Sequence, residues 1–192
     1  GGDGSTGDPY EINSCSQLND VNSTSLSANY ELVSDIDCSG TTFSEAPIAG
    51  HDIGNSVFSG TFDGNGYSIN SLTVDGSSTA GLIGSVDSAT IQNVNFNDAD
   101  FDSADYIGIV AYNSAGSGGT IIDNIVVDNA DIDTAGTYAG GIGGALGYST
   151  TTMTDVVVKN SDIASTSGGL GSLAGYYKGD ISNAAVLNTD TR

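Results

Sequence analysis

The chain has 192 residues, of which three are Lys or Arg and 24 are Asp or Glu, giving a formal net charge of −21. So few cations exclude a nucleic-acid-binding surface, and the negative charge opposes contact with an anionic membrane. Counting the Gly residues as apolar and leaving Tyr out gives about 48% apolar residues, as in ordinary folded proteins. No apolar run approaches the ~18 residues of a membrane span, and no secretory signal peptide is evident, so a secreted protein would be in its mature form.

The acidic residues are nearly all Asp, with 21 Asp and three Glu. Asp is a poor helix former and a good turn former, so with the 28 Gly residues it favours short strands joined by turns. A surface this acidic also suits a saline or calcium-rich exterior, which the dependence of stability on NaCl and CaCl2 would test.

The N-terminal part divides into a Gly-rich segment over residues 1–8, expected to be flexible, and a cap over residues 9–57. Ser14 and Gln17 fit a capping box, which predicts one short helix near residues 15–22. A strand is expected from Tyr30 to about Ile36, followed by a loop over residues 39–57. Residues 58–192 form the remaining part of a single domain.

The two cysteines, Cys15 and Cys38, lie 23 positions apart. The chain has no CxxC pair and only one His, His51, so a zinc site lacks ligands. We expect a disulfide, with two buried free thiols as the alternative; a disulfide implies an oxidising compartment outside the cell. Asn22 begins the N-x-S/T sequon of the chain, a weak candidate for glycosylation.

Five segments of residues 58–192 repeat one pattern, with apolar residues at the first, fourth and sixth positions and a small polar residue at the third. Their first residues are Ile69, Ile91, Ile122, Met153 and Ile181, spaced 22, 31, 31 and 28 residues apart. The third positions predict a bend, because Ser, Asn and Asp bond their own main chain and Asn and Asp tolerate left-handed backbone.

Further positions agree downstream of each repeat. Nine residues past the later starts lie Asp100, Asp131, Asp162 and Asp190, and two residues before these lie Asp98, Asn129, Asn160 and Asn188. A second apolar strand is expected around the Gly-rich blocks 81–84, 108–111, 144–147 and 172–175.

Repeats of 20–50 residues without helices indicate a solenoid, because so short a strand pair cannot bury its own apolar face. Stacking each repeat on the next would pair the strands in parallel and build one continuous core. We therefore predict an all-β fold, a right-handed parallel β-helix with a short N-terminal capping helix. A β-propeller needs blades of roughly 40 residues, and a β-sandwich would not keep identical apolar positions in register.

Residues 58–72, F-S-G-T-F-D-G-N-G-Y-S-I-N-S-L, and the Gly81–Gly84 block resemble the signature of the GLUG-repeat proteins. The opening Gly7–Ile12 and the Asp35–Asp37 pattern resemble the cap that precedes it in that family. The resemblance covers roughly residues 7–188, and the later repeats depart from it at Ala111 and Ser172. It implies a parallel β-helix in a large prokaryotic surface or secreted protein, serving as a stalk, adhesin or passenger module without catalytic residues of its own.

The sequence offers weak candidates for a calcium site. Asp63 to Gly66 resembles the start of a calcium loop, but the distant Glu is missing, so a tight turn is expected. The densest acidic cluster is made of Asp98, Asp100, Asp102 and Asp105, and alternation would place the first three on one strand face. Asp131 and Asp133 are a weaker copy. A solvated acidic face is the expected reading, with no cofactor and calcium as the possible exception.

Catalytic candidates are weaker still. Paired carboxylates could hydrolyse glycosides, but with 21 Asp some pair will fall at a suitable distance by chance. Elimination chemistry needs a basic group, and only Lys159, Lys178 and Arg192 exist, none in a recognisable constellation. His51 has no evident Ser or Cys partner, so a surface role is expected and the chain is predicted not to be an enzyme.

Tyr residues flank the second strand of successive repeats, at positions 106, 112, 138, 148, 176 and 177. Tyr112, Tyr148 and Tyr176 would stack into an aromatic ladder, which could bind neutral sugars but more often covers a core. Regular Thr-x-Thr rows, which an ice-binding face would need, are missing.

The fifth repeat begins at Ile181 and reaches Arg192, about half a turn, with no cap after it. Either the chain continues in the natural protein, or another subunit covers this end. A head-to-tail contact between copies would propagate into a filament. Candidate self-association residues are Ile181, Val186 and Leu187, and the expected partners are other copies or adjoining repeats, with neutral glycans possible.

The sequence thus predicts an extracellular or cell-surface structural or adhesive module without catalysis. One alternative is the subunit of an extracellular, pilus-like filament. The other is a carbohydrate-active enzyme or a glycan-binding β-helix.

Overall fold

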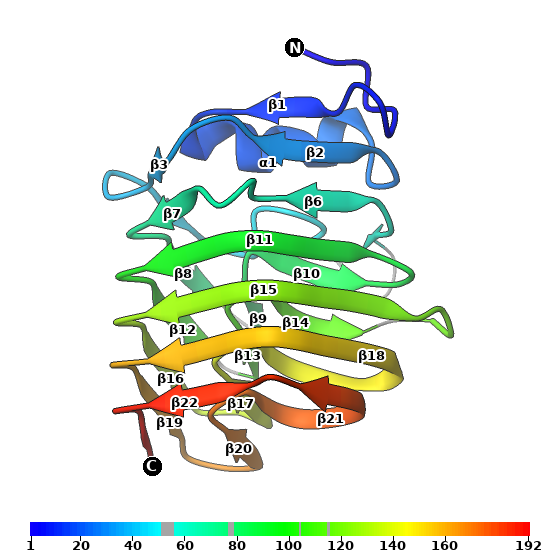
Figure 1. Ribbon diagram of the computed structural model, residues 1–192. Helices are drawn as coiled ribbons and strands as arrows, with labels where there is room; N and C mark the ends of the chain where they lie inside the picture. The colour runs from blue at the N-terminus through cyan, green and yellow to red at the C-terminus, as the bar shows by residue number, and fades with distance from the viewer. Residues whose placement is uncertain (51–55, 77–78, 104, 115) are drawn as a thin grey trace.

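The computed structural model describes residues 1–50, 56–76, 79–103, 105–114 and 116–192. The chain winds downward in successive turns, each a set of short strands paired in parallel with the turn above (Figure 1). The turns run right-handed about a common axis, with one helix near the N-terminal end. The predicted right-handed parallel β-helix with a short N-terminal helix is therefore confirmed.

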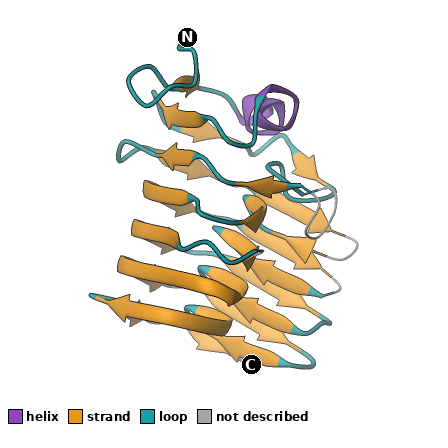
Figure 2. Cartoon of the chain, turned by 90° about the vertical axis from the view of Figure 1, so that its right-hand side faces the viewer, coloured by secondary structure: helices purple, strands orange, loops and turns teal. Residues whose placement is uncertain are grey.

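Three parallel sheets form the walls of the solenoid, seen from the side in Figure 2. The long sheet consists of β1 (Tyr10–Ile12), β2 (Asn29–Leu32), β3 (Ile36–Asp37), β5 (Val57–Phe58), β6 (Thr61–Asp63), β7 (Ser68–Asn70), β10 (Ile83–Val86), β11 (Thr90–Asn97), β14 (Ala111–Ser114), β15 (Thr120–Asp128), β18 (Gly143–Lys159), β21 (Ala174–Ser182) and β22 (Ala185–Leu187). The second sheet consists of β4 (Thr42–Phe43), β8 (Thr73–Gly76), β12 (Asp100–Ser103), β16 (Asp131–Thr134), β19 (Asp162–Ser165) and β23 (Asp190–Thr191). The third sheet consists of β9 (Thr79–Ala80), β13 (Tyr106–Gly108), β17 (Tyr138–Gly140) and β20 (Gly169–Gly171).

The core lies between these walls and is built from columns of identical positions. Ile91, Ile122 and Met153 are register partners and are fully buried. The fourth and sixth positions of the repeat form two further buried columns alongside them, Val94–Ile125–Val156 and Phe96–Val127–Val158. The predicted apolar spacing is thus confirmed for these turns, since each turn contributes one side chain to each column.

The sequence prediction placed the start of the first repeat at the wrong residue. Phe62, not Ile69, is the register partner of Ile91, and Ile69 pairs with Phe96. Seven positions separate Phe62 from Ile69, but only five separate Ile91 from Phe96, so this turn carries two extra residues at its bend. The correct starts are therefore 29, 31, 31 and 28 residues apart, which is more regular than predicted.

The predicted bends at the third position are confirmed. Every one of these residues has positive φ, from 51° to 54°: Ser71, Asn93, Asn124, Asp155 and Asn183. With the frame corrected, Ser71 belongs to a second corner, where φ again is positive, from 49° to 57°, at Asp98, Asn129, Asn160 and Asn188. Asn and Asp tolerate this left-handed backbone, so the corner residues set the length of each turn.

The Gly-rich blocks of the second strand also need correction. Gly108 pairs with Gly140 and Gly140 with Gly171, so residues 140–143 and 171–174 occupy the positions predicted for 144–147 and 172–175. Residues 140–147 read G-G-I-G-G-A-L-G, so the four-residue block can be aligned with the other repeats equally well from Gly140 or from Gly144. Several of these glycines are needed for space: a Cβ at Gly140 would lie 2.3 Å from the carbonyl oxygen of Gly143.

The predicted N-terminal helix is confirmed as α1, Cys15–Thr24, with Cys15, Leu18 and Val21 buried. Its predicted capping box does not form, because Ser14 makes no side-chain cap bond; Gln17 Oε1 instead accepts a bond from the Asn13 N–H at 2.8 Å. The predicted disulfide between Cys15 and Cys38 is present, with an S–S distance of 2.09 Å.

The segments on either side of α1 are more structured than expected. Residues 1–8 fold back on themselves, and the Gly4 carbonyl accepts bonds from the main chain and side chain of Asn29 at 3.0 and 3.1 Å. The segment predicted as a loop over 39–57 contains β4 and begins β5, and it buries Ile48, which bridges to Ile83 of the next turn. The expected strand from Tyr30 to Ile36 is divided into β2 and β3.

Candidate functional site

Two columns of carboxylates run down the outer face of the second sheet, and we call them the acid columns. One column consists of the register partners Asp100, Asp131, Asp162 and Asp190, and the other of Asp75, Asp102 and Asp133. Alternation turns the intervening Phe101 and Ile132 into the core and leaves the Asp side chains outside. Neighbouring strands lie ~4.8 Å apart, so like charges recur at that interval along the axis.

The electrostatics of the acid columns follow from this repetition. The pKa of Asp100 is raised, first because partial burial disfavours the charged carboxylate and then because Asp131 of the same column, and Asp102 and Asp75 of the other column, repel it. Farther along, Asp162 forms an ion pair with Arg192. The regular spacing of the Asp residues past each repeat start was the sequence signal for the first column, although the second was not recognised.

The predicted cluster of four acidic residues is divided by the structure. Asp100 and Asp102 share the outer face of β12, as expected. Asp98 lies at a corner before the strand, with φ of 54°, and accepts a 2.6 Å bond from the amide of Asn129. Asp105 lies beyond the strand and accepts a 2.6 Å bond from the Thr137 hydroxyl. Alternation fails at Asp98 because the corner interrupts the strand.

Calcium binding at these residues stays a prediction. Among the residues that the structure describes, no three His, Cys, Asp or Glu side chains gather closely enough to hold a metal ion. A shallow groove of about 750 Å³ lies at the corner beside the first acid column, lined by Asn129, Asn160, Asn188 and residues of β16, β19 and β23.

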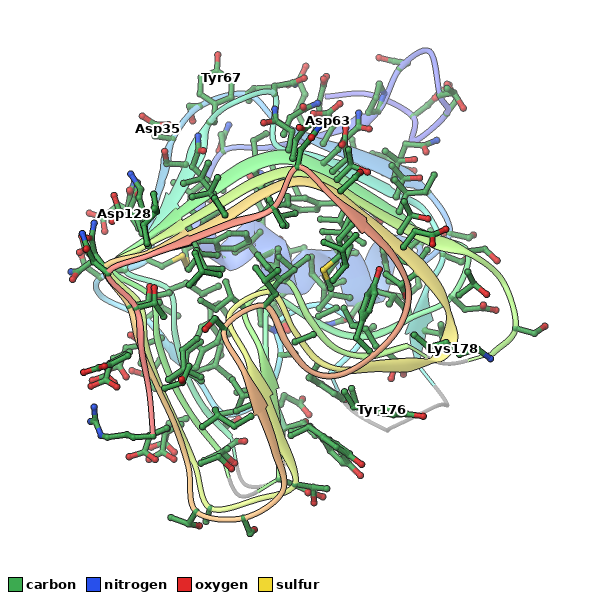
Figure 3. All side chains as sticks on the ribbon, turned by 60° about the horizontal axis from the view of Figure 1, so that its bottom comes forward. Asp35, Asp63, Tyr67, Asp128, Tyr176 and Lys178 are labelled. Atoms are coloured by element: carbon green, nitrogen blue, oxygen red, sulfur yellow. A yellow bond between two sulfur atoms is a disulfide. The ribbon has the colours of Figure 1, made fainter. Side chains whose placement is uncertain are left out.

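Asn side chains at the corners donate hydrogen bonds to several of the neighbouring Asp carboxylates. Asn160 donates a 2.8 Å bond to Asp128, whose pKa is lowered first by this bond and then by Lys159, whose ammonium lies 3.0 Å away. Figure 3 shows Asp128 at this corner. The contacts of Asn160 and Lys159 with Asp128 therefore stabilise the corner and serve a structural role.

The Asp63–Gly66 segment is a tight turn, as expected. The Asn65 N–H donates to Asp63 Oδ1 at 2.8 Å, and Asn65 and Gly66 have φ of 51° and 82°. Gln92 Nε2 donates to the other carboxylate oxygen of Asp63 at 2.6 Å, and Asn93 adds a bond at 3.1 Å. The Asp63 carboxylate thus ties two turns together.

An aromatic ladder exists and includes Tyr176 as predicted, but its other members are Tyr106 and Tyr138. The side chain of Tyr148, also predicted as a member, lies outside the described part of the structure. Tyr106 and Tyr138 stack with centroids 5.8 Å apart, and Tyr138 and Tyr176 with centroids 5.4 Å apart. Tyr112, predicted as a member, is fully buried in the core instead. A shift of one residue exchanges the inner and outer faces of a strand, which explains the error. Because the rings cover each other's faces, a sugar would meet mainly their edges.

Two further candidates have different outcomes. Asn22 of the sequon lies in α1, where its amide donates to the Pro47 carbonyl at 2.7 Å and accepts from the Ala49 N–H at 2.8 Å. A glycan on that nitrogen would displace the bond to Pro47. His51 lies outside the described residues, so its predicted surface role stays a prediction.

The C-terminal turn, residues 169–192, exposes Ile181 and Val186, whose register partners Met153 and Val158 are buried, and it also exposes Leu187, whose partner Lys159 faces outward. The predicted self-association residues Ile181, Val186 and Leu187 are 44%, 41% and 53% exposed. Lys178 and Tyr176 lie at the rim of this turn, seen from below in Figure 3. Strands β21 and β22 pair with β18 above them, and β23 and β20 end their own sheets.

Comparison with known proteins places the fold but shows no family. No family model matches the chain, so the resemblance to GLUG-repeat proteins stays a prediction. Over 131 residues, 60% of its length, the chain is 39% identical to halomucin from Haloquadratum walsbyi (strain DSM 16790 / HBSQ001), of which it spans 1%. It also resembles the structure of a Bacteroides ovatus protein provisionally assigned as an immunoglobulin A1 protease, with a TM-score of 0.50 and 18% identity over 98% of this chain and 79% of that one. At that identity the likeness shows the fold alone.

Within the described residues, no helix is both long and apolar enough to span a lipid bilayer.

Proposed function

We propose that this chain is a non-catalytic structural module of a prokaryotic extracellular or cell-surface protein. The observation that carries the proposal is the 39% identity to a stretch of halomucin, whose name denotes a mucin, in a chain that folds as a parallel solenoid. A disulfide between Cys15 and Cys38 supports the same location, because disulfides persist in oxidising compartments. An acidic, rigid solenoid would act as a spacer in a surface layer or as a passive adhesive surface.

The arrangement of the acids supports a role without catalysis. Glycoside hydrolysis needs two carboxylates facing one substrate, one of them with a raised pKa. The pKa of Asp100 is raised, but its neighbours Asp102 and Asp131 lie on the same flat strand face, exposed like it. Asp63 and Asp128 are held by hydrogen bonds from neighbouring turns. Incubation with a panel of neutral and acidic glycans should give no turnover, and measurable turnover would overturn this part of the proposal.

The location can be tested on the source cells. A membrane-impermeant biotin reagent should label Lys159 or Lys178 on intact cells, and iodoacetamide should leave Cys15 and Cys38 unmodified unless a reductant is added. Labelling only after lysis, together with free thiols in the isolated protein, would contradict an extracellular module.

A second candidate function is the subunit of an extracellular filament. It is supported by the exposed apolar side chains of Ile181 and Val186 in the last described turn. Open parallel edges recruit other strands, and a contact between unlike ends propagates. Electron microscopy of the concentrated protein should then show fibres.

A further inference from the structure

The first turn of the solenoid contains a helix where the later turns carry strands. The chain passes from β1 to β2 through α1, whereas the second sheet begins only in the next turn, with β4. The helix lies at the N-terminal end of the stack of strands (Figure 2). Because a helix bonds its main chain internally and cannot extend a sheet, a groove of about 430 Å³ remains between α1 and β4. Its walls come from residues 16–20 and 41–45, so neither end of the chain contributes to it.

The two walls of the groove are fastened to each other at both ends. At one end the disulfide joins Cys15, the first residue of α1, to Cys38, three positions before the opposite wall. At the other end the side-chain amide of Asn22 donates to the Pro47 carbonyl at 2.7 Å, and its oxygen accepts from the Ala49 N–H at 2.8 Å. Walls that are held in this way lose less conformational entropy on binding than free loops would, so the groove is preorganised for a ligand.

Phe43 supplies an aromatic surface to the groove. It pairs with Val74 and begins the inward column that continues through Phe101 and Ile132. Those three side chains are buried, but Phe43 is the first of the column and stays partly exposed, packing on the core and lining the groove. A partly exposed ring of this kind can pack against the C–H groups of a ligand.

Polar side chains surround Phe43. Asn19 and Asp20 line the groove from α1, and Thr42 and Ser44 line it from the opposite wall. The Asp20 carboxylate and the hydroxyls of Thr42 and Ser44 make no hydrogen bond to any residue that the structure describes. Their hydrogen-bonding capacity is therefore available to a ligand.

The charge of the lining selects the kind of ligand. It contains two acids, Asp20 and Glu45, and no cation, and residues 1–142 contain no Lys or Arg. A uronate, phosphate or sulfate group would meet repulsion here with no cation to balance it. Hydroxyl groups, in contrast, donate hydrogen bonds to a carboxylate, and a sugar ring adds C–H groups that pack on an aromatic side chain. The volume of the groove also falls within the ~300–1,000 Å³ of small-ligand sites.

We propose that the groove between α1 and β4 binds a neutral saccharide, with Phe43 against a sugar ring and Asp20 accepting hydrogen bonds from the sugar hydroxyls. The site rests on the proposed function, since it names the class of ligand that an adhesive module would hold. The disulfide and the contacts of Asn22 keep both walls in place before the ligand arrives.

An array of immobilised neutral oligosaccharides, with uronate-containing and glucosamine-containing oligosaccharides beside them, tests the site. The parent should bind at least one neutral member and none of the uronates. For that member, titration calorimetry should show Asp20→Ala binding about tenfold more weakly, because a hydrogen bond to a charged acceptor is lost. Phe43→Leu, which stays apolar but lacks a flat ring, should bind about threefold more weakly or worse. The control is Asp123→Ala, which makes the same change in charge on the outer face of β15 and should bind as the parent does.

Circular dichroism checks that each variant is folded, and Asp20→Ala removes no hydrogen bond that the carboxylate makes within the described chain. If no neutral member binds the parent, or if Asp20→Ala and Phe43→Leu both bind as the parent does, the proposal is overturned. If only glucosamine members bind, and about 1 M NaCl with its Debye length of ~3 Å abolishes this binding, the groove is a cation site and the proposal is likewise overturned. These outcomes leave the structural module standing, because its location and its lack of turnover are measured separately.

Discussion

Replacing Asp100 with Asn should make the protein more stable, although Asp100 is an exposed surface residue. Its carboxylate has Asp131 beside it on the next turn, Asp102 two residues on in the same strand, and Asp75 and Asp133 diagonally across on the two neighbouring strands. Asn keeps the shape of the side chain and removes one member of this array of like charges. The raised pKa of Asp100 reflects the same repulsion, added to its partial burial.

The magnitude follows from the sheet geometry. The strand spacing of ~4.8 Å and the two-residue step of ~6.6 Å place the two diagonal neighbours at roughly 8 Å. Coulomb's law in water, with a Debye length of ~10 Å at about 0.1 M salt, gives a summed repulsion of about 1.3 kcal/mol from the four neighbours. At about 1 M salt the Debye length is ~3 Å, and the same sum falls to about 0.3 kcal/mol.

Urea unfolding followed by circular dichroism, at low and at high NaCl, measures the effect. Asp123→Asn is the matched control, because Asp123 lies on the outer face of β15 with the neutral Gln92 and Thr154 as register partners. It should change the free energy of unfolding by much less than Asp100→Asn at low salt. Equal effects of the two substitutions, or a stabilisation by Asp100→Asn that does not shrink with salt, would refute the repulsion between turns.

Three further outcomes are expected. Reducing the disulfide between Cys15 and Cys38 should lower the free energy of unfolding by about 3 kcal/mol through the entropy of the 23-residue loop, measured by urea unfolding with and without reductant. In the core column, Ile125→Ala should cost about 2–5 kcal/mol, whereas Ile121→Ala, at a position 47% exposed, should cost far less; comparable losses would contradict the inward face assigned to Ile125. The folded-state pKa of Asp100 is raised, so the folded protein binds a proton at this carboxyl more readily than the unfolded chain does. The stabilisation by Asp100→Asn should therefore shrink as the pH falls from neutrality through that raised pKa towards 3.8. A stabilisation that does not change with pH would contradict the repulsion assigned to Asp100.

The solenoid was predictable because its core is a set of columns. Ile91, Ile122 and Met153 sit one above another, so the constant length of a turn appears directly as a constant spacing in the sequence. The corner residues reinforce the signal, since Asn and Asp recur where the backbone must be left-handed. The disulfide was predictable for another reason: only one pairing of Cys15 and Cys38 exists.

The errors in the predicted register arose where a turn changes length or where a run of Gly leaves no apolar spacing to align. Two extra residues in the bend before Ile69 moved that residue from the first column to another, and the run of Gly at 140–147 hid the frame of the strand. The assignment of Tyr112 to the outer ladder failed because a one-residue offset reverses the face of a strand. Such offsets depend on contacts between turns, which spacing along the chain does not record.

The acid columns were only half visible in the sequence. The Asp residues at fixed distance from each repeat start were recognised, but their alignment into a surface lattice needs the register of β8, β12 and β16. Asp98 was grouped with Asp100 and Asp102 because alternation was assumed to continue, although a corner separates them.

The parallel stacking of turns has a mechanical consequence for a chain held at its two ends. Hydrogen bonds between turns run along the axis, so an axial pull strains them one turn at a time, and a turn detaches without disturbing those beyond its neighbour. A turn such as Ile91 to Ile122 contains 31 residues, so its release would lengthen the tether by about 100 Å. The loop between Cys15 and Cys38 is covalently closed and cannot extend. Such a solenoid would yield in steps under tension and thereby dissipate force.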